Sequence, residues 1–252
     1  MTRTFIRFAV ISLLILFGFI LGANQYRTRG WPFGLSVFKA ISIGDVGSKK
    51  KQTLAWVEKL RKGGFILYFR HASRDAWPLV SAFDVYALAA NLQDPSLASF
   101  RRAVCLTDQG IEEAKILGKI LELAKIPTGT VVSSPSCRAM QTAIYAFGKV
   151  DRVDNSLLYV ALLSDKVLPG FVNQLRTLLL NIDIKPGTNT VITAHNGTLE
   201  RNKGLAIEGD MEFLDETGFY IIERKGNDKL AVVYAIKSIS DVATSAVDLP
   251  LK

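Results

Sequence analysis

Short apolar runs alternate with amphipathic stretches from about residue 52 onward, and this alternation constrains the fold more than any other feature of the sequence. The apolar runs are rich in aromatic and β-branched residues and are typical of buried strands. They lie at 64–69, 129–134, 189–194, 218–224 and 230–237. Helical spacing marks the stretches at 53–62, 106–125, 135–148 and 167–182. The alternation predicts an α/β protein with a largely parallel sheet, and the final two runs predict a hairpin that makes the sheet mixed.

The stretch 106–125 is the clearest predicted helix. Its apolar residues recur at steps of three or four and form one stripe. They are Ile111, Ala114, Leu117, Leu121 and Ala124. Thr107 or Asp108 can cap its N-terminus through a side-chain oxygen.

The N-terminus differs in composition from the rest of the chain. Residues 8–23 carry no charge and follow a short basic segment, which predicts an export signal or an N-terminal membrane anchor. Sixteen helical residues would span about 24 Å, which is less than the roughly 30 Å hydrocarbon core of a bilayer. Residues 5–23 could span more of the core if the Arg7 side chain extends to the lipid headgroups. A buried core helix is the alternative. The small residues at 22–23 form a weak cleavage site, so the sequence leaves anchor and cleaved signal open.

The membrane-anchor and the cleaved-signal interpretations both place the rest of the chain outside the cytoplasm of a bacterial cell. In a bacterial cell we expect a protein anchored in the inner membrane and facing the periplasm, or a periplasmic or secreted protein if residues 1–23 are removed. Residues 24–51 mix glycine, basic residues and scattered aromatics, and we interpret them as a linker. Residues 52–252 then form the folded domain. The whole chain has 49% hydrophobic and 21% charged residues, which is typical of a globular protein.

The net charge of +8 favours an anionic ligand or a negatively charged membrane surface, although it is equally suited to general solubility. Apart from the lysines at 49–51, no basic run with interleaved aromatic residues occurs. We therefore expect no nucleic-acid partner. The oligomeric state does not follow from the sequence.

Both histidines of the chain directly follow predicted strands. His71 comes after the run 64–69 and Arg70, and His195 comes after the run 189–194. In open α/β sheets, ligands bind at the carboxyl ends of the strands. A single histidine is more often structural, but two at equivalent strand ends predict a site.

A third strand end adds a cationic group. The predicted strand 129–134 leads into a helix, for which Ser134 can be the N-cap and Pro135 the first residue. Arg138 then lies in the first turn, beside free backbone N–H groups. A surface salt bridge is the alternative for Arg138 alone. Because guanidinium groups bind phosphate in a bidentate manner, Arg138 and Arg70 together indicate a dianionic ligand.

The sequence lacks the motifs of several other chemistries. We find no P-loop, no G-x-G-x-x-G, no G-x-S-x-G and no H-x-x-x-H spacing, and two cysteines are too few for a structural zinc site. A neutral histidine can itself attack phosphorus while arginines hold the phosphoryl oxygens. The residues present therefore suffice for phosphoryl transfer with no metal and no cofactor.

Three motifs together resemble the histidine phosphatase superfamily, which has the phosphoglycerate-mutase-like fold. They are "RHASRD" at 70–75, "SSPSCRAMQTA" at 133–143 and "HN" at 195–196, and "LTDQGIEEAKILGKIL" resembles the family's helix motif. The resemblance covers about 63–237, with alanine replacing the glycine of the family's "RHG". It implies a three-layer α/β/α sandwich that hydrolyses a small phosphorylated substrate. It also implies that His71 becomes phosphohistidine and that Arg70, Arg138 and His195 bind the phosphate.

The group that protonates the leaving oxygen is not apparent from the resemblance. Asp75, four residues after His71, is our first choice, with Glu216 and Glu200 as alternatives. Each of the three is individually more often a structural carboxylate. Some members of the superfamily function without such an acid.

The two cysteines, Cys105 and Cys137, permit one disulfide in an exported chain, and two buried thiols are the alternative. The resemblance places both near the site, where a 105–137 disulfide would brace the loop of Arg138.

The natural substrate is open at this stage. An exported phosphatase would meet envelope sugar phosphates, a class suggested by analogy alone. A phosphoprotein phosphatase and a catalytically silent anion-binding module on the same fold are the alternatives. Residues 76–104 and 149–170 are expected to line the entrance of the site.

Overall fold

The computed structural model describes residues 43–75, 105–159, 168–196, 198–199, 205–226 and 228–246. The chain divides into two units, Met1–Ile43 and Gly44–Lys252, and the described residues belong to the second unit apart from Ile43. The predictions for residues 1–23 and 76–104 lie outside this part of the chain. None of its helices combines the length and the apolar character needed to cross a membrane.

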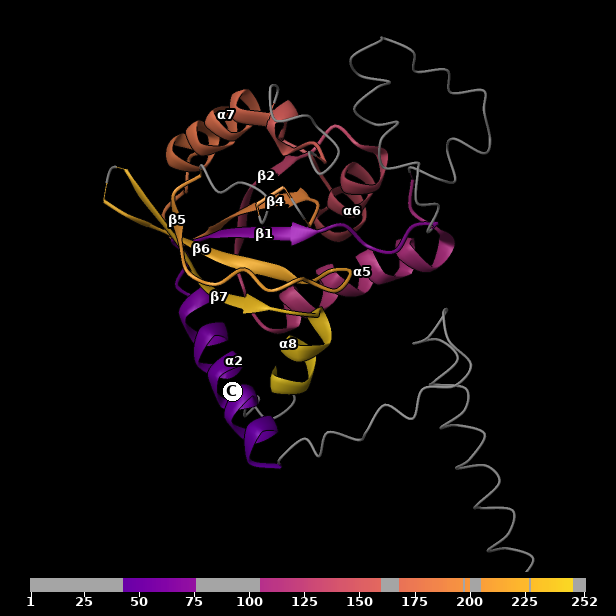
Figure 1. Cartoon of the computed structure of the whole chain (residues 1–252). Coiled ribbons are helices and arrows are strands. Elements are labelled where there is room, and N and C mark those ends of the chain that lie inside the picture. The colour runs from indigo at the N-terminus through magenta and orange to yellow at the C-terminus, as the bar shows by residue number, and fades with distance from the viewer. Residues whose placement is uncertain are drawn as a thin grey trace, which may run out of the picture. The chain divides into compact units, whose positions relative to one another are not determined.

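A seven-stranded sheet forms the centre of the described structure, in the order β3-β2-β4-β1-β6-β7-β5 (Figure 1). The strands are β1 (Ile66–Arg70), β2 (Thr128–Ser133), β3 (Arg152–Val153), β4 (Asn189–Ala194), β5 (Ile207–Glu208), β6 (Phe219–Lys225) and β7 (Lys229–Ile236). Only β6 runs antiparallel to its neighbours β1 and β7, and the other pairs are parallel. The predicted mixed, largely parallel sheet is confirmed, including the hairpin of β6 and β7.

Helices cover both faces of the sheet, as Figure 1 shows. They are α2 (Ile43–Leu60), α5 (Asp108–Leu123), α6 (Cys137–Phe147), α7 (Leu168–Asn181) and α8 (Ile239–Ala246), with a short 3-10 helix, η1, at Asn155–Leu157. Leucines of α7 belong to the apolar core on one face. Residues of α2, α5, α6 and α8 form the core on the other face. The structure is thus the predicted three-layer α/β/α sandwich.

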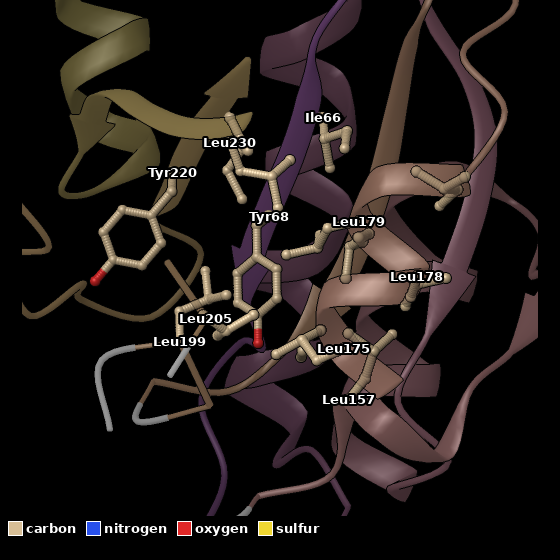
Figure 2. Packing of buried hydrophobic residues seen from close by; sticks show 14 of the residues in the cluster. Ile66, Tyr68, Leu157, Leu175, Leu178, Leu179, Leu199, Leu205, Tyr220 and Leu230 are labelled. Atoms are coloured by element: carbon tan, nitrogen blue, oxygen red, sulfur yellow. The ribbon is translucent and has the colours of Figure 1, made fainter. Parts of the chain in front are cut away.

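Strand β1 connects the two cores because its side chains alternate between the faces. Ile66 and Tyr68 belong to the core beneath α7, and Leu67 and Phe69 belong to the core on the opposite face. All four side chains are fully buried. Figure 2 shows Tyr68 pointing toward the leucines of α7. Burial on both faces explains why this strand appears in the sequence as a continuous apolar run.

Several local predictions are confirmed within one or two residues. Strand β4 has the predicted bounds, and Thr107 is the N-cap of α5, with its side chain accepting a hydrogen bond from the Gly110 N–H. The helix at 53–62 is longer than predicted: α2 begins at Ile43, inside the segment 24–51 that we interpreted as a linker. Residues 47–52 of α2 are exposed and include three lysines, so no apolar stripe marks this part of the helix.

Helices α5 and α6 approach each other closely at a glycine. A Cβ atom at Gly118 would lie 2.1 Å from the backbone oxygen of Ala146, a distance that real contacts do not reach. Because the obstructing atom belongs to the backbone, a side chain here would have to push α5 and α6 apart. The position of α6 therefore depends on a residue without a side chain.

We expect Gly118→Ala to lower the free energy of unfolding by about 1–3 kcal/mol, although alanine favours helices, because the substitution overpacks the contact. Gly47→Ala in α2 is the matched control, since a Cβ atom at Gly47 would have no neighbour within 4 Å. It should raise the free energy of unfolding by up to about 1 kcal/mol. Urea denaturation measures both variants. Equal stabilisation by the two substitutions would contradict the proposed contact.

Candidate active site

The structure brings four predicted site residues to the carboxyl edge of the sheet. Arg70 ends β1 and His71 follows it, while His195 follows β4, the parallel neighbour of β1. The His71 N–H donates to the Ala194 carbonyl at 3.1 Å, so the pairing of the two strands continues into the site. The two imidazole rings lie 5.3 Å apart, centroid to centroid. Arg138 comes from α6, which follows the other neighbour of β4.

His71 is held in one tautomer by the backbone. Its Nδ1 atom lies 2.7 Å from the Ala72 carbonyl oxygen. A carbonyl can only accept, so Nδ1 carries the proton and Nε2 keeps its lone pair. Burial lowers the pKa of His71 well below 6.5, and the charge of Arg138 lowers it further, against the raising effect of the Ala72 hydrogen bond. The neutral ring has a nucleophilic nitrogen at physiological pH.

His195 is oriented by two serines. Its Nε2 atom lies 3.1 Å from the Ser134 hydroxyl and 3.2 Å from the Ser136 hydroxyl. The opposite ring nitrogen, Nδ1, is buried and has no hydrogen-bond partner among the described residues. Burial lowers the pKa of His195 well below 6.5, with Arg138 and then His71 as the next causes. When the serines donate to Nε2, the neutral ring presents Nδ1–H to a ligand.

The helix that carries Arg138 begins later than predicted. Ser136 rather than Ser134 is the N-cap of α6, and its side chain makes no capping hydrogen bond. The hydroxyl that would cap the helix faces His195 instead. This contact joins residues distant in the sequence, which explains why local capping rules placed the helix start too early.

Arg138 lies in the first turn of α6 and is only 1% exposed. Thr142 ties this turn to the nucleophile loop: its hydroxyl donates to the Arg138 carbonyl at 2.8 Å and accepts from the Ala72 N–H at 3.0 Å. A buried guanidinium near a helix N-terminus, beside two neutral histidines, creates a strongly anion-attracting site.

Arg70 is held by the segment that precedes β6. One Nη atom donates to the Leu214 carbonyl at 2.6 Å, and the other forms an ion pair with Glu216. The Phe213 ring lies over the guanidinium, 5.2 Å from centroid to Cζ. Of the five N–H donors of Arg70, these contacts within the described part of the chain use two. The sequence singled out Glu216 only as an acid and had no signal for Phe213, since both contacts span the chain from β1 to the turn before β6.

The predicted proton donors have different surroundings. Asp75 is partly buried, and its carboxylate makes no hydrogen bond or ion pair with any other described residue. Arg74 donates instead to the Asp75 carbonyl at 2.7 Å. Glu216 pairs with Arg70, and Glu200 lies outside the described residues. The role of Asp75 stays a prediction.

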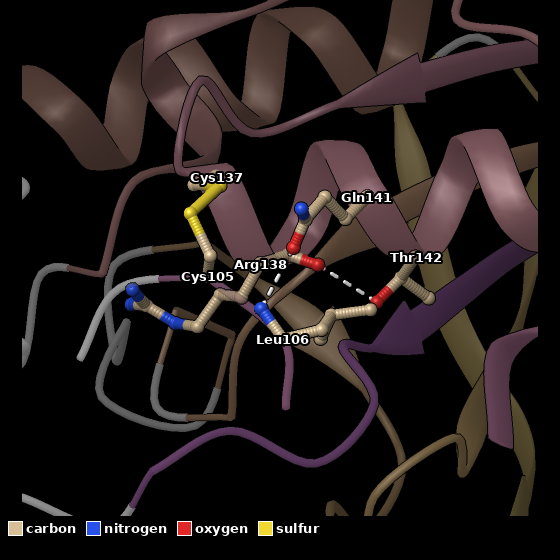
Figure 3. Close-up of a disulfide and its surroundings, with 6 residues drawn as sticks. All are labelled: Cys105, Leu106, Cys137, Arg138, Gln141 and Thr142. Atoms are coloured by element: carbon tan, nitrogen blue, oxygen red, sulfur yellow. Dashed lines mark hydrogen bonds between the residues drawn. A yellow bond between two sulfur atoms is a disulfide. The ribbon is translucent and has the colours of Figure 1, made fainter. Parts of the chain in front are cut away.

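A disulfide joins Cys105 to Cys137, the first residue of α6 (Figure 3). Beside it, the Leu106 N–H donates to the Gln141 side chain at 2.7 Å. Leu106 also forms a β-bridge with Arg74 in the nucleophile loop. The disulfide therefore connects the segment before α5, the first turn of α6 and, through Leu106, the loop that follows His71.

Comparisons with known proteins give structural matches of low similarity only. Neither a known protein family nor a curated protein matches the sequence. The protein histidine phosphatase SixA, solved in complex with tungstate, matches at 14% identity and a TM-score of 0.47, over 71% of this chain and 99% of SixA. A mycobacterial glucosyl-3-phosphoglycerate phosphatase matches at 14% identity and a TM-score of 0.43, over 69% and 98% of the two chains.

A third match is a phosphoserine phosphatase from Entamoeba histolytica, with 15% identity and a TM-score of 0.42, over 70% of this chain and 98% of that one. At such identities and scores, none of these similarities assigns an activity to the present chain. The function must be inferred from its own residues.

We expect both histidines to stay neutral below pH 6.5, where an exposed imidazole is half protonated. Because these are the only two histidines, an NMR titration of the imidazole protons follows both rings with little overlap. Their midpoints should lie well below 6.5, and those of the urea-unfolded chain near 6.5. The unfolded chain then binds more protons below pH 6.5, so the free energy of unfolding should fall as the pH decreases. A folded-state midpoint at or above 6.5 for both rings would contradict the burial argument.

Proposed function

We propose that the protein is a phosphomonoester hydrolase that acts through a phosphohistidine at His71. The observation that carries the proposal is the tautomer of His71: with Nδ1–H bound to the Ala72 carbonyl, the Nε2 lone pair is available beside Arg70, Arg138 and His195. Nucleophile and cationic groups then meet at one edge of the sheet. Phosphoryl transfer requires mainly such positioning and charge stabilisation.

The proposed reaction has two steps. First, Nε2 of His71 attacks phosphorus, the bond from phosphorus to the ester oxygen breaks, and the leaving oxygen takes the electron pair and a proton. Second, water attacks the phosphohistidine and gives a proton to the group that protonated the leaving oxygen, and the electron pair of the N–P bond returns to Nε2. The guanidinium groups of Arg70 and Arg138 would stabilise the phosphoryl oxygens in both steps, with His195 donating through Nδ1–H.

The leaving oxygen needs a proton, and Asp75 is the proposed donor. The alternative, Glu216, is engaged with Arg70 in an ion pair, an arrangement that suits a carboxylate which positions the arginine. Asp75 has no such partner among the described residues and lies in the loop of the nucleophile. It is therefore the carboxyl group better suited to exchange a proton with the substrate.

Hydrolysis of para-nitrophenyl phosphate by the full chain tests the proposal. We expect turnover that EDTA does not reduce and that His71→Ala abolishes. Brief reaction with 32P-labelled substrate should leave label on the peptide that contains His71. Lys119→Ala, on the exposed side of α5, is the control and should retain wild-type turnover. Phosphate binding without turnover would favour the silent anion-binding module instead.

The same assay examines Asp75. In Asp75→Asn, turnover of a phosphate ester with a poor alkyl leaving group should fall by roughly 10²-fold or more. Turnover of para-nitrophenyl phosphate should fall much less, because para-nitrophenolate leaves without a proton. An equal decrease for both substrates would remove Asp75 from the role of acid.

We also propose that the protein is exported, either anchored through residues 5–23 or released after cleavage, and that envelope sugar phosphates are among its substrates. The uncharged stretch at 8–23 supports export, and the Cys105–Cys137 disulfide is typical of proteins in oxidising compartments.

Fractionation of bacteria that produce the full chain tests the proposed location. We expect the protein in the membrane or periplasmic fraction, with both cysteines protected from a thiol-specific mass tag unless a reductant is added. Recovery in the cytosolic fraction, with two tagged thiols, would contradict both export and the disulfide.

A further inference from the structure

Phe213 is an exposed aromatic residue in contact with a phosphate-binding group. Its side chain is 61% exposed, and its ring lies over the Arg70 guanidinium, 5.2 Å from centroid to Cζ. Single exposed apolar residues are common and need no explanation. This one differs because it lies at the site rather than on a remote surface.

The backbone on both sides of Phe213 is fixed, so the exposure of its ring is built into the fold. Leu214 is 1% exposed, and its carbonyl accepts from Arg70 and from the Asn196 side chain, each at 2.6 Å. On the other side, the Glu212 carbonyl accepts a hydrogen bond from the Tyr220 hydroxyl. The ring is therefore positioned in advance, and a ligand that contacts it spends little free energy on ordering it.

The proposed displacement directs the leaving group away from His71. In an in-line displacement the leaving oxygen lies opposite the attacking atom. His71 is nearly buried, whereas Phe213 is largely exposed. A leaving group that extends from His71 toward solvent would pass the exposed ring if it leaves on the side of Arg70.

We infer that Phe213 is a specificity-determining residue, which stacks on a ring of the leaving group that has a flat, apolar face. The inference rests on the proposed function and narrows its substrate class to phosphomonoesters with a ring close to the phosphate. Stacked or edge-to-face ring pairs contribute beyond the burial of their area. Aryl rings and the apolar face of a sugar ring share the required chemistry.

A second aromatic ring lies at the same site. Tyr159 is partly exposed, and its ring is 5.9 Å from that of His195, with an interplanar angle of 77°. It comes from the segment after β3, far from Phe213 in the sequence. Two separate segments thus contribute aromatic rings beside phosphate-binding side chains, which fits a ring-bearing substrate better than a small aliphatic one.

Phe213 could instead serve only to hold Arg70, and the two roles have different consequences. A ring that merely supports Arg70 affects every phosphate ligand equally, because all of them contact the guanidinium. A ring that stacks on the leaving group affects only ligands that carry a ring. Two phosphonates that cannot be hydrolysed separate these roles, namely phenylphosphonate and methylphosphonate.

Calorimetric titration of the full chain with both phosphonates is the experiment. We expect the wild type to bind phenylphosphonate more tightly than methylphosphonate. Phe213→Ala should weaken phenylphosphonate binding by roughly three- to tenfold and change methylphosphonate binding by less than twofold. Leu123→Ala is the matched control, because Leu123 is 67% exposed at the end of α5 away from the site. It should change neither affinity.

Each other result has a defined meaning. Equal weakening of both phosphonates by Phe213→Ala, or no preference for the phenyl ligand in the wild type, would overturn the inference while leaving the proposed function intact. Failure of both phosphonates to bind the wild type would contradict the phosphate pocket, and with it the proposed function and the inference together. A parallel titration with the C-glycosidic phosphonate of glucose, which cannot be hydrolysed, distinguishes sugar rings from aryl rings. A matching loss of affinity in Phe213→Ala indicates a sugar ring, and an unchanged affinity beside the phenylphosphonate loss indicates an aryl ring.

Discussion

Parallel pairing of β1 with β4, and of β4 with β2, is the interaction on which the site depends. These three strands end at the same edge, and the pairing continues past their ends through the His71 N–H to the Ala194 carbonyl and the Ser134 N–H to the Thr193 carbonyl. Backbone hydrogen bonds therefore set the spacing of the segments that carry both histidines. Side-chain hydrogen bonds then orient groups whose backbone positions are already set by the sheet.

The charge of one buried arginine, Arg138, dominates the electrostatics of the site. Arg138 is almost completely buried, and its charge helps to keep both neighbouring imidazoles neutral. Guanidinium groups form strong, charge-assisted hydrogen bonds with phosphate, so a phosphate bound here would lie in the field of Arg138. The positive charge of Arg138 therefore attracts the phosphate and also helps to keep His71 neutral, so that the lone pair of its Nε2 atom can attack phosphorus.

The sequence predicted those parts of the structure that depend on local patterns. Strand β4 and the cap at Thr107 were found because periodicity and capping chemistry are short-range signals. His71 and His195 were found because they directly follow strands. The start of α6 at Cys137 was missed, since the Ser136 hydroxyl faces a distant histidine instead of capping its own helix. No local pattern could show that Phe213 and Glu216 lie on Arg70, or that the two cysteines pair, because only the folded sheet brings these segments together.

The central position of β1 in the sheet determines which parts of the chain must be present before the anion site can form. Ile66 pairs with Thr190 on one side and with Ile222 on the other, so the strand that carries the nucleophile is flanked by segments from the last third of the chain. Non-local pairings of this kind form slowly, because the intervening chain must first be closed into a loop. An emerging chain that stops short of β4 (Asn189–Ala194) can build α5 and α6, but it has no neighbours for β1. The complete anion site therefore requires the last third of the chain, and a partly synthesised chain that lacks β4 cannot bring His71 and His195 together.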